Sequence, residues 1–360
     1  MKILYVYDNM PGVYQNYLNG LLKAIKEKLP VKTLVYAASK TSDYVAGSNR
    51  LKDKLQRLYY KLGLTKMPTL DLKYMLQYDV VHLQHSYLWK KMLPFIDLKE
   101  QQKLVITLRG GDTYLKPWSY RTLANFYESG SEKVDAFVVM SQHQKEYLMR
   151  WGVLADRIHI IPISFGGKSK ASPKKPKPDK LHLVSAFRMT WEKNIEGHIQ
   201  FAAELKARGI NFSYDIYGNG SNLDQLYFLV DRYELQKNIN IKGKIINTQL
   251  KTLLPNYDFF VQLSISESLG MSVIEAQSCG VPCIVSNSGG LPEAVIKNET
   301  AIVEDYRDIK MIVDSCLSLW NNESLYYSYS KNAITYANAN FTVNQELEKL
   351  ELLYTKLLDS

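Results

Sequence analysis

Short apolar runs alternate with stretches of helical periodicity along most of the chain. In the first half, the apolar runs have the length of buried strands and lie at 2–7, 32–37, 79–84, 103–108, 135–140 and 157–162. Between these runs, apolar residues recur at helical spacing, as they do in 13–28 and 142–150. This alternation is typical of a parallel sheet that is covered by helices on both faces.

The second half repeats the alternation after a break. Residues 166–180, GGKSKASPKKPKPDK, are rich in Lys, Pro and Ser and have no apolar periodicity, which predicts a linker. Strand-like runs resume at 181–187, 212–218, 238–243, 259–264 and 282–286, and the pattern of the remaining residues is mostly helical.

These patterns predict two doubly wound α/β domains, at 1–164 and 181–341, joined by a linker at 165–180. An amphipathic helix expected at 342–360 is a candidate for packing on the first domain. In doubly wound sheets, ligands bind beyond the carboxyl ends of the strands. With two such domains, we expect the active site in the cleft between them.

The composition is typical of a globular chain that does not span a membrane. Hydrophobic residues make up 46% of the 360 residues and charged residues 22%, which excludes a disordered chain. No apolar run approaches the roughly 20 residues that span a bilayer, and the initial MKILYVY predicts a strand rather than a signal peptide. Because Cys279, Cys283 and Cys316 form no C-x-x-C pair, we expect reduced, buried thiols in a cytoplasmic protein and no zinc site.

The net charge of +9 is unevenly distributed. Residues 1–180 carry a net charge of +15, whereas residues 181–360 carry −6. A basic first domain favours an acidic surface or an anionic partner, although ordinary surface lysines produce the same pattern. Nucleic acid is suggested only by this charge, and the chain contains no nucleic-acid-binding motif, so we expect no such partner.

Two carboxylates, Glu267 and Glu275, lie in SISESLGMSVIEAQSCGVPC, which otherwise has the pattern of buried core. The pattern predicts a helix at 271–279, so Glu267 precedes its N-terminus and Glu275 lies inside it, about 12 Å away along the axis. The amides between them form an anion site, and Gly270 lets a phosphate approach the backbone. This layout fits a nucleotide-sugar, which has hydroxyls at both ends and phosphates in the middle. Alternatively, Glu267 favours only the helix dipole and Glu275 is an exposed helix residue.

The same stretch resembles the signature of glycosyltransferase family 4, whose members are retaining enzymes of the GT-B fold, with two Rossmann-like domains facing a cleft. The matching residues are Ser264, Glu267, Gly270, Glu275, Ala276, Gly280, Pro282, Ile284, Gly289, Gly290, Pro292 and Glu293. The resemblance implies that Glu267 contacts the donor sugar and that Glu275 holds the ribose hydroxyls. It also implies that the amides from Leu269 to Met271 hold the diphosphate. The match is detailed in the second half of the chain and thinner in the first.

Further motifs of the second half are similar to the same family. In SAFRMTWEKN, Arg188 and Lys193 have the spacing of the family's pyrophosphate ligands, and solvated surface cations are the alternative. Gly218 and Gly220 lack the third glycine of a dinucleotide fingerprint, so a tight turn is the alternative to the family's Gly-x-Gly near the nucleotide. Lys244 lies in KGKI, which is similar to a family segment whose backbone faces the base.

The first domain presents polar residues at two expected strand ends. His85 follows one strand and Arg109 follows another, and we expect both to act in catalysis. Asp112 and Tyr114 are candidates for contacting the acceptor. Arg109 stands where the family usually has His before Gly, which leaves open whether it stabilises the transition state or binds an acidic acceptor. It cannot act as a base, because it stays protonated. Gly12 is a single glycine where family members commonly carry two, so its expected contact with the donor phosphates has weaker support.

Residues 48–66 predict a basic amphipathic helix. Its apolar face comprises Leu51, Leu55, Leu58 and Leu62, and lysines and arginines occupy much of the remaining surface. Such a helix lies on an anionic membrane surface in some proteins. The alternative is a helix that packs its Leu face on its own sheet and exposes its lysines to water.

The sequence therefore predicts a retaining hexosyltransferase that moves a sugar from a nucleoside-diphosphate sugar to an acceptor hydroxyl. Because no Asp-x-Asp occurs in the chain, we expect no metal and no other cofactor. The expected acceptor is a sugar or lipid-linked sugar in the synthesis of a cell-surface polysaccharide or glycolipid. We expect a cytoplasmic protein. Whether it also binds peripherally to the cytoplasmic face of the membrane stays open at this point.

Other activities on the same architecture stay open at this point. A nucleotide-sugar epimerase would change a sugar without any acceptor, and a silent scaffold would bind a nucleotide-sugar without turnover. Glycoside hydrolysis is disfavoured, because about 12 Å between the carboxylates exceeds the roughly 5–9.5 Å that such mechanisms use.

Overall fold

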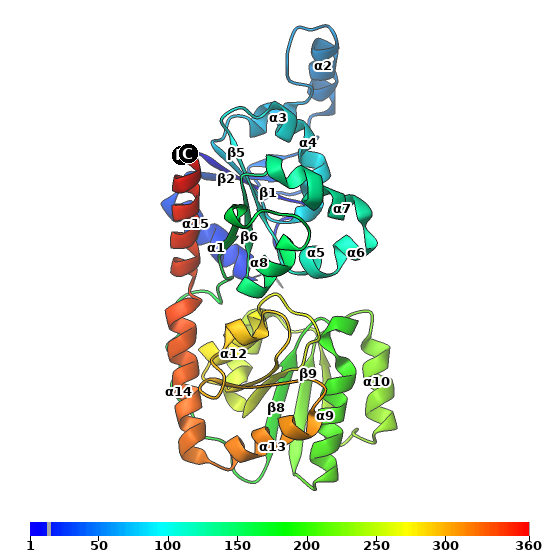
Figure 1. Ribbon diagram of the computed structural model, residues 1–360, viewed down its shortest axis with the longest axis vertical. Coiled ribbons are helices and arrows are strands. Elements are labelled where there is room, and N and C mark those ends of the chain that lie inside the picture. Colours follow the sequence, from blue (N-terminus) through cyan, green and yellow to red (C-terminus); the bar gives the residue numbers. More distant parts are fainter. Residues whose placement is uncertain (13–15, 360) are drawn as a thin grey trace. The chain divides into compact units, whose positions relative to one another are not determined.

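The structure, a computed structural model, describes residues 1–12 and 16–359 and contains two compact units (Figure 1). Unit 1 comprises Met1–Gly12, Leu18–Pro162 and the C-terminal helix from Glu346 onward. Unit 2 is built mainly from Ile163–Gln345. Within the described parts, no helix is both long enough and apolar enough to cross a bilayer.

Unit 1 is a parallel sheet flanked by helices. Its strands are β1 (Ile3–Tyr7), β2 (Val31–Val35), β3 (Tyr44–Val45), β4 (Val80–Leu83), β5 (Lys103–Thr107), β6 (Ala136–Val139) and β7 (Ile158–Ile160), in the order β3-β2-β1-β4-β5-β6-β7. Its helices include α1 (Asn16–Lys28), α2 (Arg50–Lys61), α3 (Leu70–Met75), α4 (Trp89–Leu98), α5 (Gly111–Tyr114), α6 (Lys116–Ser119), α7 (Arg121–Asn125), α8 (Gln142–Met149) and most of α15 (Val343–Leu358). Every residue of β1, β4 and β6 is buried, because helices cover both faces of the sheet.

A buried polar network attaches α15 to the sheet of unit 1. The hydroxyl of Tyr354 lies 2.9 Å from the hydroxyl of Tyr5 and 2.6 Å from Nδ1 of His82. The other ring nitrogen of His82 lies 2.7 Å from the hydroxyl of Thr107. Burial, reinforced by Arg109, lowers the pKa of His82 to about 3, so this imidazole is neutral and the network is uncharged.

Unit 2 repeats the doubly wound plan. Its strands are β8 (Leu181–Ala186), β9 (Phe212–Tyr217), β10 (Ile239–Gly243), β11 (Phe259–Gln262), β12 (Cys283–Ser286) and β13 (Ala301–Glu304), in the order β10-β9-β8-β11-β12-β13. Its helices are α9 (Ile195–Ala207), α10 (Leu223–Arg232), α11 (Asn247–Leu253), α12 (Met271–Ser278), α13 (Ile309–Trp320) and α14 (Glu323–Asn340). All described strand pairings in both sheets are parallel.

The structure differs from the sequence pattern at two strands. β3 and β13 lie in regions without a predicted strand, and β13 falls where a mostly helical pattern was expected. β13 pairs in register with β12, from Cys283 opposite Ala301 to Ser286 opposite Glu304. Such a short apolar run is ambiguous by periodicity, and its parallel partner is what makes it a strand.

The expected helix 13–28 is seen from Asn16, and its first three residues lie outside the described part.

The segment expected as a linker, 165–180, belongs to unit 2 and is hydrogen-bonded along it. The amide of Ser169 donates to Asn338 at 2.7 Å, and the amide of Lys174 donates to the Ser330 hydroxyl at 2.9 Å. The amide of Lys177 donates to Asp258 at 2.8 Å. Side chains distant in sequence thus satisfy its backbone, and composition cannot reveal such partners.

Candidate active site

A pocket of about 510 Å³ lies beyond the carboxyl ends of β8 and β9, beside the N-terminus of α12. Five residues predicted from the sequence to contact the donor or its leaving group line it, namely Arg188, Gly218, Lys244, Met271 and Glu275. Other contributions from unit 2 are Ala186, Phe187, Tyr217, Asn219, Ile245, Asn247, Leu250 and Ser272. The pocket occupies the edge of the sheet at which doubly wound folds bind ligands.

Glu275 supplies a buried carboxylate to this pocket. It lies on α12 with only 3% of its surface exposed, so it is not the exposed helix residue of the alternative interpretation. Its Oε1 accepts a hydrogen bond from the side-chain amide of Asn247 and lies 4.0 Å from the ammonium of Lys251. Burial raises the pKa of Glu275, and Lys251 and Asn247 oppose the rise. A carboxylate held in this way can accept hydrogen bonds from ligand hydroxyls.

Glu267 lies outside the lining of this pocket and forms an ion pair with Lys193. Lys193 ends the short 3-10 helix η6 (Trp191–Lys193) after β8, and Glu267 lies in the loop after β11. Only 13% and 15% of the two side chains are exposed. Glu267 also accepts hydrogen bonds from the side-chain amide of Gln262 at 2.8 Å and from the backbone amide of Ser268 at 3.2 Å. The carboxylate is therefore fixed in place at the carboxyl edge of the sheet.

Two glycines after β12 hold the backbone of the Glu267 loop. The amide of Gly290 donates to the carbonyl oxygen of Glu267 at 2.8 Å. Gly289 has a φ of +59°, and a Cβ at this position would lie 2.3 Å from the same oxygen. Only glycine allows this close approach, which explains the first glycine of the Gly-Gly pair in the sequence motif.

Gly218 and Gly220 have a structural role in the same pocket. A Cβ on Gly218 would lie 1.9 Å from the carbonyl oxygen of Phe187, and one on Gly220 would lie 2.2 Å from that of Met189. The two glycines therefore let the loop that carries Arg188 pack directly on the turn after β9. Gly218 lines the pocket and Gly220 does not. Gly220 therefore fits the alternative in which the glycine only forms a tight turn.

The N-terminus of α12 presents backbone amides beside the pocket. Gly270 precedes the helix with a φ of +94° and provides no side-chain cap, and a Cβ there would lie 2.6 Å from Cδ2 of Leu291. Met271 and Ser272 line the pocket, whereas Leu269 is buried and Gly270 lies outside the lining. Orphan amides at a helix start attract anions.

Arg188 is far more exposed than Lys193. Its side chain is 71% exposed, and its contact is a 3.4 Å ion pair with Glu192. Glu192 is buried and also accepts a 2.7 Å hydrogen bond from the hydroxyl of Thr190. The guanidinium can therefore turn toward an anion in the pocket at small cost, because an exposed ion pair contributes only about 0–1 kcal/mol.

A buried histidine that the sequence did not single out positions the β11 loop. Nε2 of His198 accepts a hydrogen bond from the amide of Leu263 at 3.2 Å, so Nδ1 carries the proton toward the hydroxyl of Tyr214, 2.6 Å away. Burial, with a contribution from Lys193, lowers the pKa of His198 to about 3. This neutral side chain fixes the end of β11 ahead of Glu267. It occupies an apolar helix face, so no local signal could have identified it.

In unit 1, His85 and Arg109 lie at the carboxyl ends of adjacent strands β4 and β5. The guanidinium of Arg109 donates to the backbone oxygen of Gln84 at 3.2 Å and to its side-chain oxygen at 3.0 Å. Burial, then the charge of Arg109, lowers the pKa of His85 to about 4, although Asp8 partly opposes the shift. His85 is therefore neutral at physiological pH and can exchange a proton or accept a hydrogen bond.

The two acceptor-side candidates are buried instead of facing an open surface. Asp112 accepts hydrogen bonds from the amides of Arg109 and Gly110, both at 3.0 Å, and from the hydroxyl of Ser86 at 3.1 Å. It therefore shapes the turn after β5. The hydroxyl of Tyr114 lies 3.0 Å from Nδ1 of His143. Short polar motifs after a strand do not distinguish a turn-forming side chain from one that contacts a ligand.

Gly12 lies in the exposed loop after β1, where a Cβ would meet no atom of the described residues within 4 Å. The position therefore does not require glycine to avoid a clash.

The cysteines carry free thiols, and Cys283 and Cys316 are buried whereas Cys279 is partly exposed.

Two family models match consecutive parts of the chain. The model for Glycosyltransferase Family 4 matches residues 35–163, and the model for glycosyl transferases group 1 matches residues 168–336. This chain is a family-4 glycosyltransferase. The first match lies in unit 1 and the second in unit 2, so each unit matches a family model of its own. The strand orders and parallel pairings agree with the GT-B fold of two Rossmann-like domains that the sequence predicted.

Curated relatives of this family-4 protein are distant. The N-acetyl-alpha-D-glucosaminyl L-malate synthase of Bacillus anthracis is 24% identical over 292 residues, which cover 78% of this chain and 74% of the relative. The putative colanic acid biosynthesis glycosyltransferase WcaL of Salmonella typhimurium is 28% identical over 149 residues. That match covers 40% of this chain and only 36% of the relative.

The fold of the family-4 protein is also found in solved structures. Anabaena Alr3699/HepE, whose structure is in complex with UDP-glucose, superposes with a TM-score of 0.74 at 16% identity. The superposition covers 99% of this chain and 100% of the Anabaena protein. At this identity the likeness shows a shared fold.

Proposed function

We propose that this glycosyltransferase moves a sugar from a nucleoside-diphosphate sugar to an acceptor hydroxyl and retains the configuration at the anomeric carbon. The observation that carries the proposal is the buried carboxylate of Glu275 in the wall of the unit 2 pocket, beside the start of α12. A ribose binds such a carboxylate through its hydroxyls, and a diphosphate binds the amides at the helix start.

The proposed roles of the charged groups follow from their positions. Arg188 is exposed at the pocket and turns toward the diphosphate, whose charge increases as the sugar leaves. Lys193 adds a second positive charge and orients Glu267, which binds the hydroxyls of the transferred sugar. Lys244 lines the side of the pocket at which we place the base.

We propose that transfer needs no metal. Arg188, Lys193 and the amides of α12 supply the positive charge that a cation gives to a leaving diphosphate in other transferases. Among the described residues, no group of three His, Cys, Asp or Glu side chains is arranged to hold a metal ion. On the acceptor side, we assign Arg109 to charge stabilisation and neutral His85 to hydrogen bonding or proton exchange.

The donor and the pathway are proposed from the relatives. HepE was solved with UDP-glucose, and the Bacillus anthracis relative is named as an N-acetyl-alpha-D-glucosaminyl L-malate synthase, so a UDP-hexose is the first donor to test. The match to a protein named for colanic acid biosynthesis supports a role in making a cell-surface polysaccharide or glycolipid.

We also propose that α2 binds an anionic membrane surface. None of its residues is buried, and Leu51, Leu55 and Leu58 are 77%, 51% and 49% exposed. The alternative in which the Leu face packs on the sheet is therefore wrong. Figure 1 shows α2 standing away from the sheet of unit 1.

The attachment of α2 indicates which face is available to a membrane. The side chain of Gln56 donates to the carbonyl oxygen of Met67 at 2.7 Å, and the carboxylate of Asp53 accepts from the amide of Leu70 at 3.2 Å. At about 100° per residue, Asp53 and Gln56 lie roughly opposite the leucines. Lysines and arginines flank the exposed Leu face, and this combination suits the interface of an anionic bilayer.

The activity is tested by incubating the protein with UDP-glucose, UDP-N-acetylglucosamine and GDP-mannose in EDTA, with a panel of lipid-linked and free sugars. Proton NMR reports the anomeric configuration of any product. We expect acceptor-dependent release of UDP and a product with the configuration of the donor. Conversion of the donor sugar without an acceptor would instead identify an epimerase, and nucleotide binding without any turnover would identify a scaffold.

A further inference from the structure

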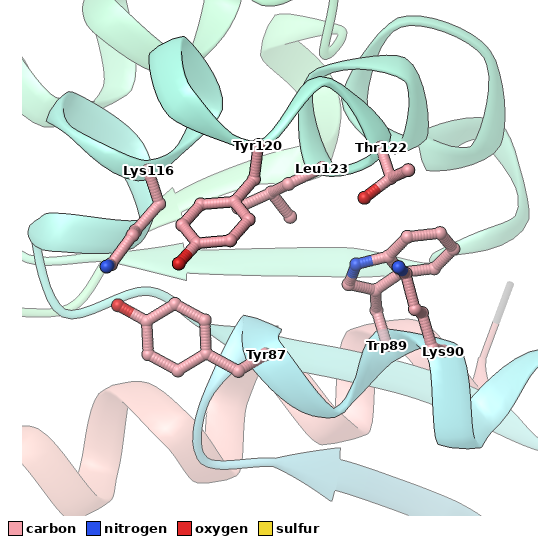
Figure 2. A pocket seen from close by; sticks show the side chains of 7 residues that line it. All are labelled: Tyr87, Trp89, Lys90, Lys116, Tyr120, Thr122 and Leu123. Atoms are coloured by element: carbon pink, nitrogen blue, oxygen red, sulfur yellow. The ribbon is translucent and has the colours of Figure 1, made fainter.

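A second pocket, in unit 1, combines three aromatic rings with two cations (Figure 2). It has a volume of about 360 Å³. Tyr87, Trp89 and Lys90 come from the segment after β4. Lys116 lies on α6 and Tyr120 lies between α6 and α7, in the segment after β5. The pocket therefore lies at the carboxyl edge of the unit 1 sheet, where doubly wound domains bind ligands.

The aromatic rings give this pocket open apolar walls. Tyr87 and Tyr120 are 54% and 56% exposed, so both rings present apolar surface to the pocket. Trp89 is fixed from behind, because it stacks on Phe126 with ring centres 4.5 Å apart. The C–H faces of a sugar ring pack on such surfaces, and the hydroxyl of Thr122 adds a polar contact.

The cations of the pocket lack acidic partners. No carboxylate lines it, and among the described residues neither Lys90 nor Lys116 forms an ion pair. The ammonium of Lys116 lies 5.0 Å from the centre of the Tyr120 ring, and that of Lys90 lies 5.6 Å from the centre of the Trp89 ring. In Figure 2 the tyrosine hydroxyls point toward Lys116, and Lys90 lies across the pocket beside Trp89. Two uncompensated charges beside apolar rings favour an anionic ligand.

We infer that this pocket binds an anionic sugar unit of the acceptor. The sugar ring packs between Tyr87 and Tyr120, and its carboxylate or phosphate binds Lys116, with Lys90 as a second contact. The inference rests on the proposed transfer reaction, since it assigns the pocket to the acceptor. In this inference the acceptor contacts the pocket of Tyr87, Lys116 and Tyr120 and not the buried Asp112 and Tyr114, which the sequence had suggested. Lys ammonium groups act as point charges, so the pocket accepts a uronic acid and a sugar phosphate alike.

The inference is tested by saturation-transfer NMR titrations of the full chain with three probes. The probes are methyl β-D-glucuronide, glucose 6-phosphate and the neutral methyl β-D-glucoside. We expect at least one charged probe to bind roughly 3- to 10-fold more tightly than the glucoside at low salt, as for a partly exposed ion pair. This preference should shrink at high salt, and the preferred anion identifies the sugar as a uronic acid or a sugar phosphate.

The variants decide whether the preference belongs to this pocket. Lys116→Gln should abolish most of it and Lys90→Gln part of it, whereas Lys73→Gln, which removes an exposed lysine of α3, should leave it intact. Equal binding of all three probes, or an unchanged preference in both pocket variants, would overturn the inference. UDP binding, measured on the same samples, separates the two proposals, because intact UDP binding with no anion preference leaves the donor site standing.

Discussion

The ammonium of Lys193 forms an ion pair with the carboxylate of Glu267, 74 positions further along the chain. Both side chains are largely buried, and Gln262 holds the same carboxylate oxygen. The pair joins the segment after β8 to the loop after β11. A cation proposed to act on the diphosphate and an acid proposed to act on the sugar are thus held as one unit.

Breaking this pair should reduce turnover far more than breaking an exposed one. Lys193→Ala and Glu267→Gln should each lower kcat about 10²- to 10³-fold, because each removes charge that stabilises the transition state. The double variant should lose much less than the product of the two effects, since the residues act together. Lys206→Ala removes an exposed ion pair with Glu234 and serves as the control. Additive losses in steady-state kinetics would argue against a shared role.

The carboxyl group of Glu275 should make stability depend on pH. Burial raises its pKa above the ordinary value of 4.5. Between these two values the folded protein keeps a proton that the unfolded chain has released, so the wild type loses stability as the pH rises through this window. Glu275→Gln has no such titration. Its free energy of unfolding, relative to the wild type, should therefore increase with pH above about 4.5, as denaturant titrations would measure. A difference that does not vary with pH would mean that the carboxyl group is not desolvated.

The close contact of Gly289 with Glu267 can be separated from its backbone conformation. Gly289→Ala introduces both a positive-φ residue and a clash with the Glu267 carbonyl oxygen. Gly209 has a similar φ of +69° with no atom within 4 Å, so Gly209→Ala carries the conformational cost alone, about 1–2 kcal/mol. Thermal unfolding should show a larger loss for Gly289→Ala, and only that variant should also lose kcat. Equal losses of stability and of kcat in the two variants would contradict the role assigned to the contact between Gly289 and Glu267.

Binding of α2 to membranes should require anionic lipid. The wild type should co-sediment with liposomes that contain phosphatidylglycerol, bind less as salt increases, and ignore pure phosphatidylcholine. Reversing Lys52, Lys54 and Arg57 to Glu should abolish sedimentation, because about 1 kcal/mol is lost for each basic residue near the surface.

A control with the same change of net charge tests whether the helix itself is responsible. Reversing Lys23, Lys28 and Lys73 alters exposed positions of unit 1 outside α2. This variant should still sediment to a large extent. If both triple variants bind as the wild type does, or if both lose binding equally, α2 is not the membrane-binding element.

Much of the fold could be predicted from the sequence, because buried parallel strands leave a local signal. The run KILYVY predicts β1, and the pattern from 271 to 279 predicts α12. β13 was missed, since its strand character comes from pairing with β12 and not from its own periodicity. The polar segment 165–180 was interpreted as a linker because its hydrogen-bond partners lie far away in sequence.

The candidate site was predictable only where a motif carried the information. Glu275 was expected in the pocket because of the family signature, and the structure places it there. His198 left no signal, since a buried histidine on a helix looks like any core position. The pocket of Tyr87, Lys116 and Tyr120 was also missed, because two segments that lie apart in sequence build it together.

The central claim is that the pocket beside Glu275 binds a nucleoside diphosphate. Isothermal titration of UDP, GDP, ADP and CMP in EDTA, against the wild type and Glu275→Ala, tests it most directly. We predict micromolar binding of one diphosphate, with UDP the first candidate, and a loss of about 1–3 kcal/mol in the variant, which lacks the carboxylate for the ribose. Absence of binding by all four nucleotides, or equal affinity in the variant, would contradict the claim.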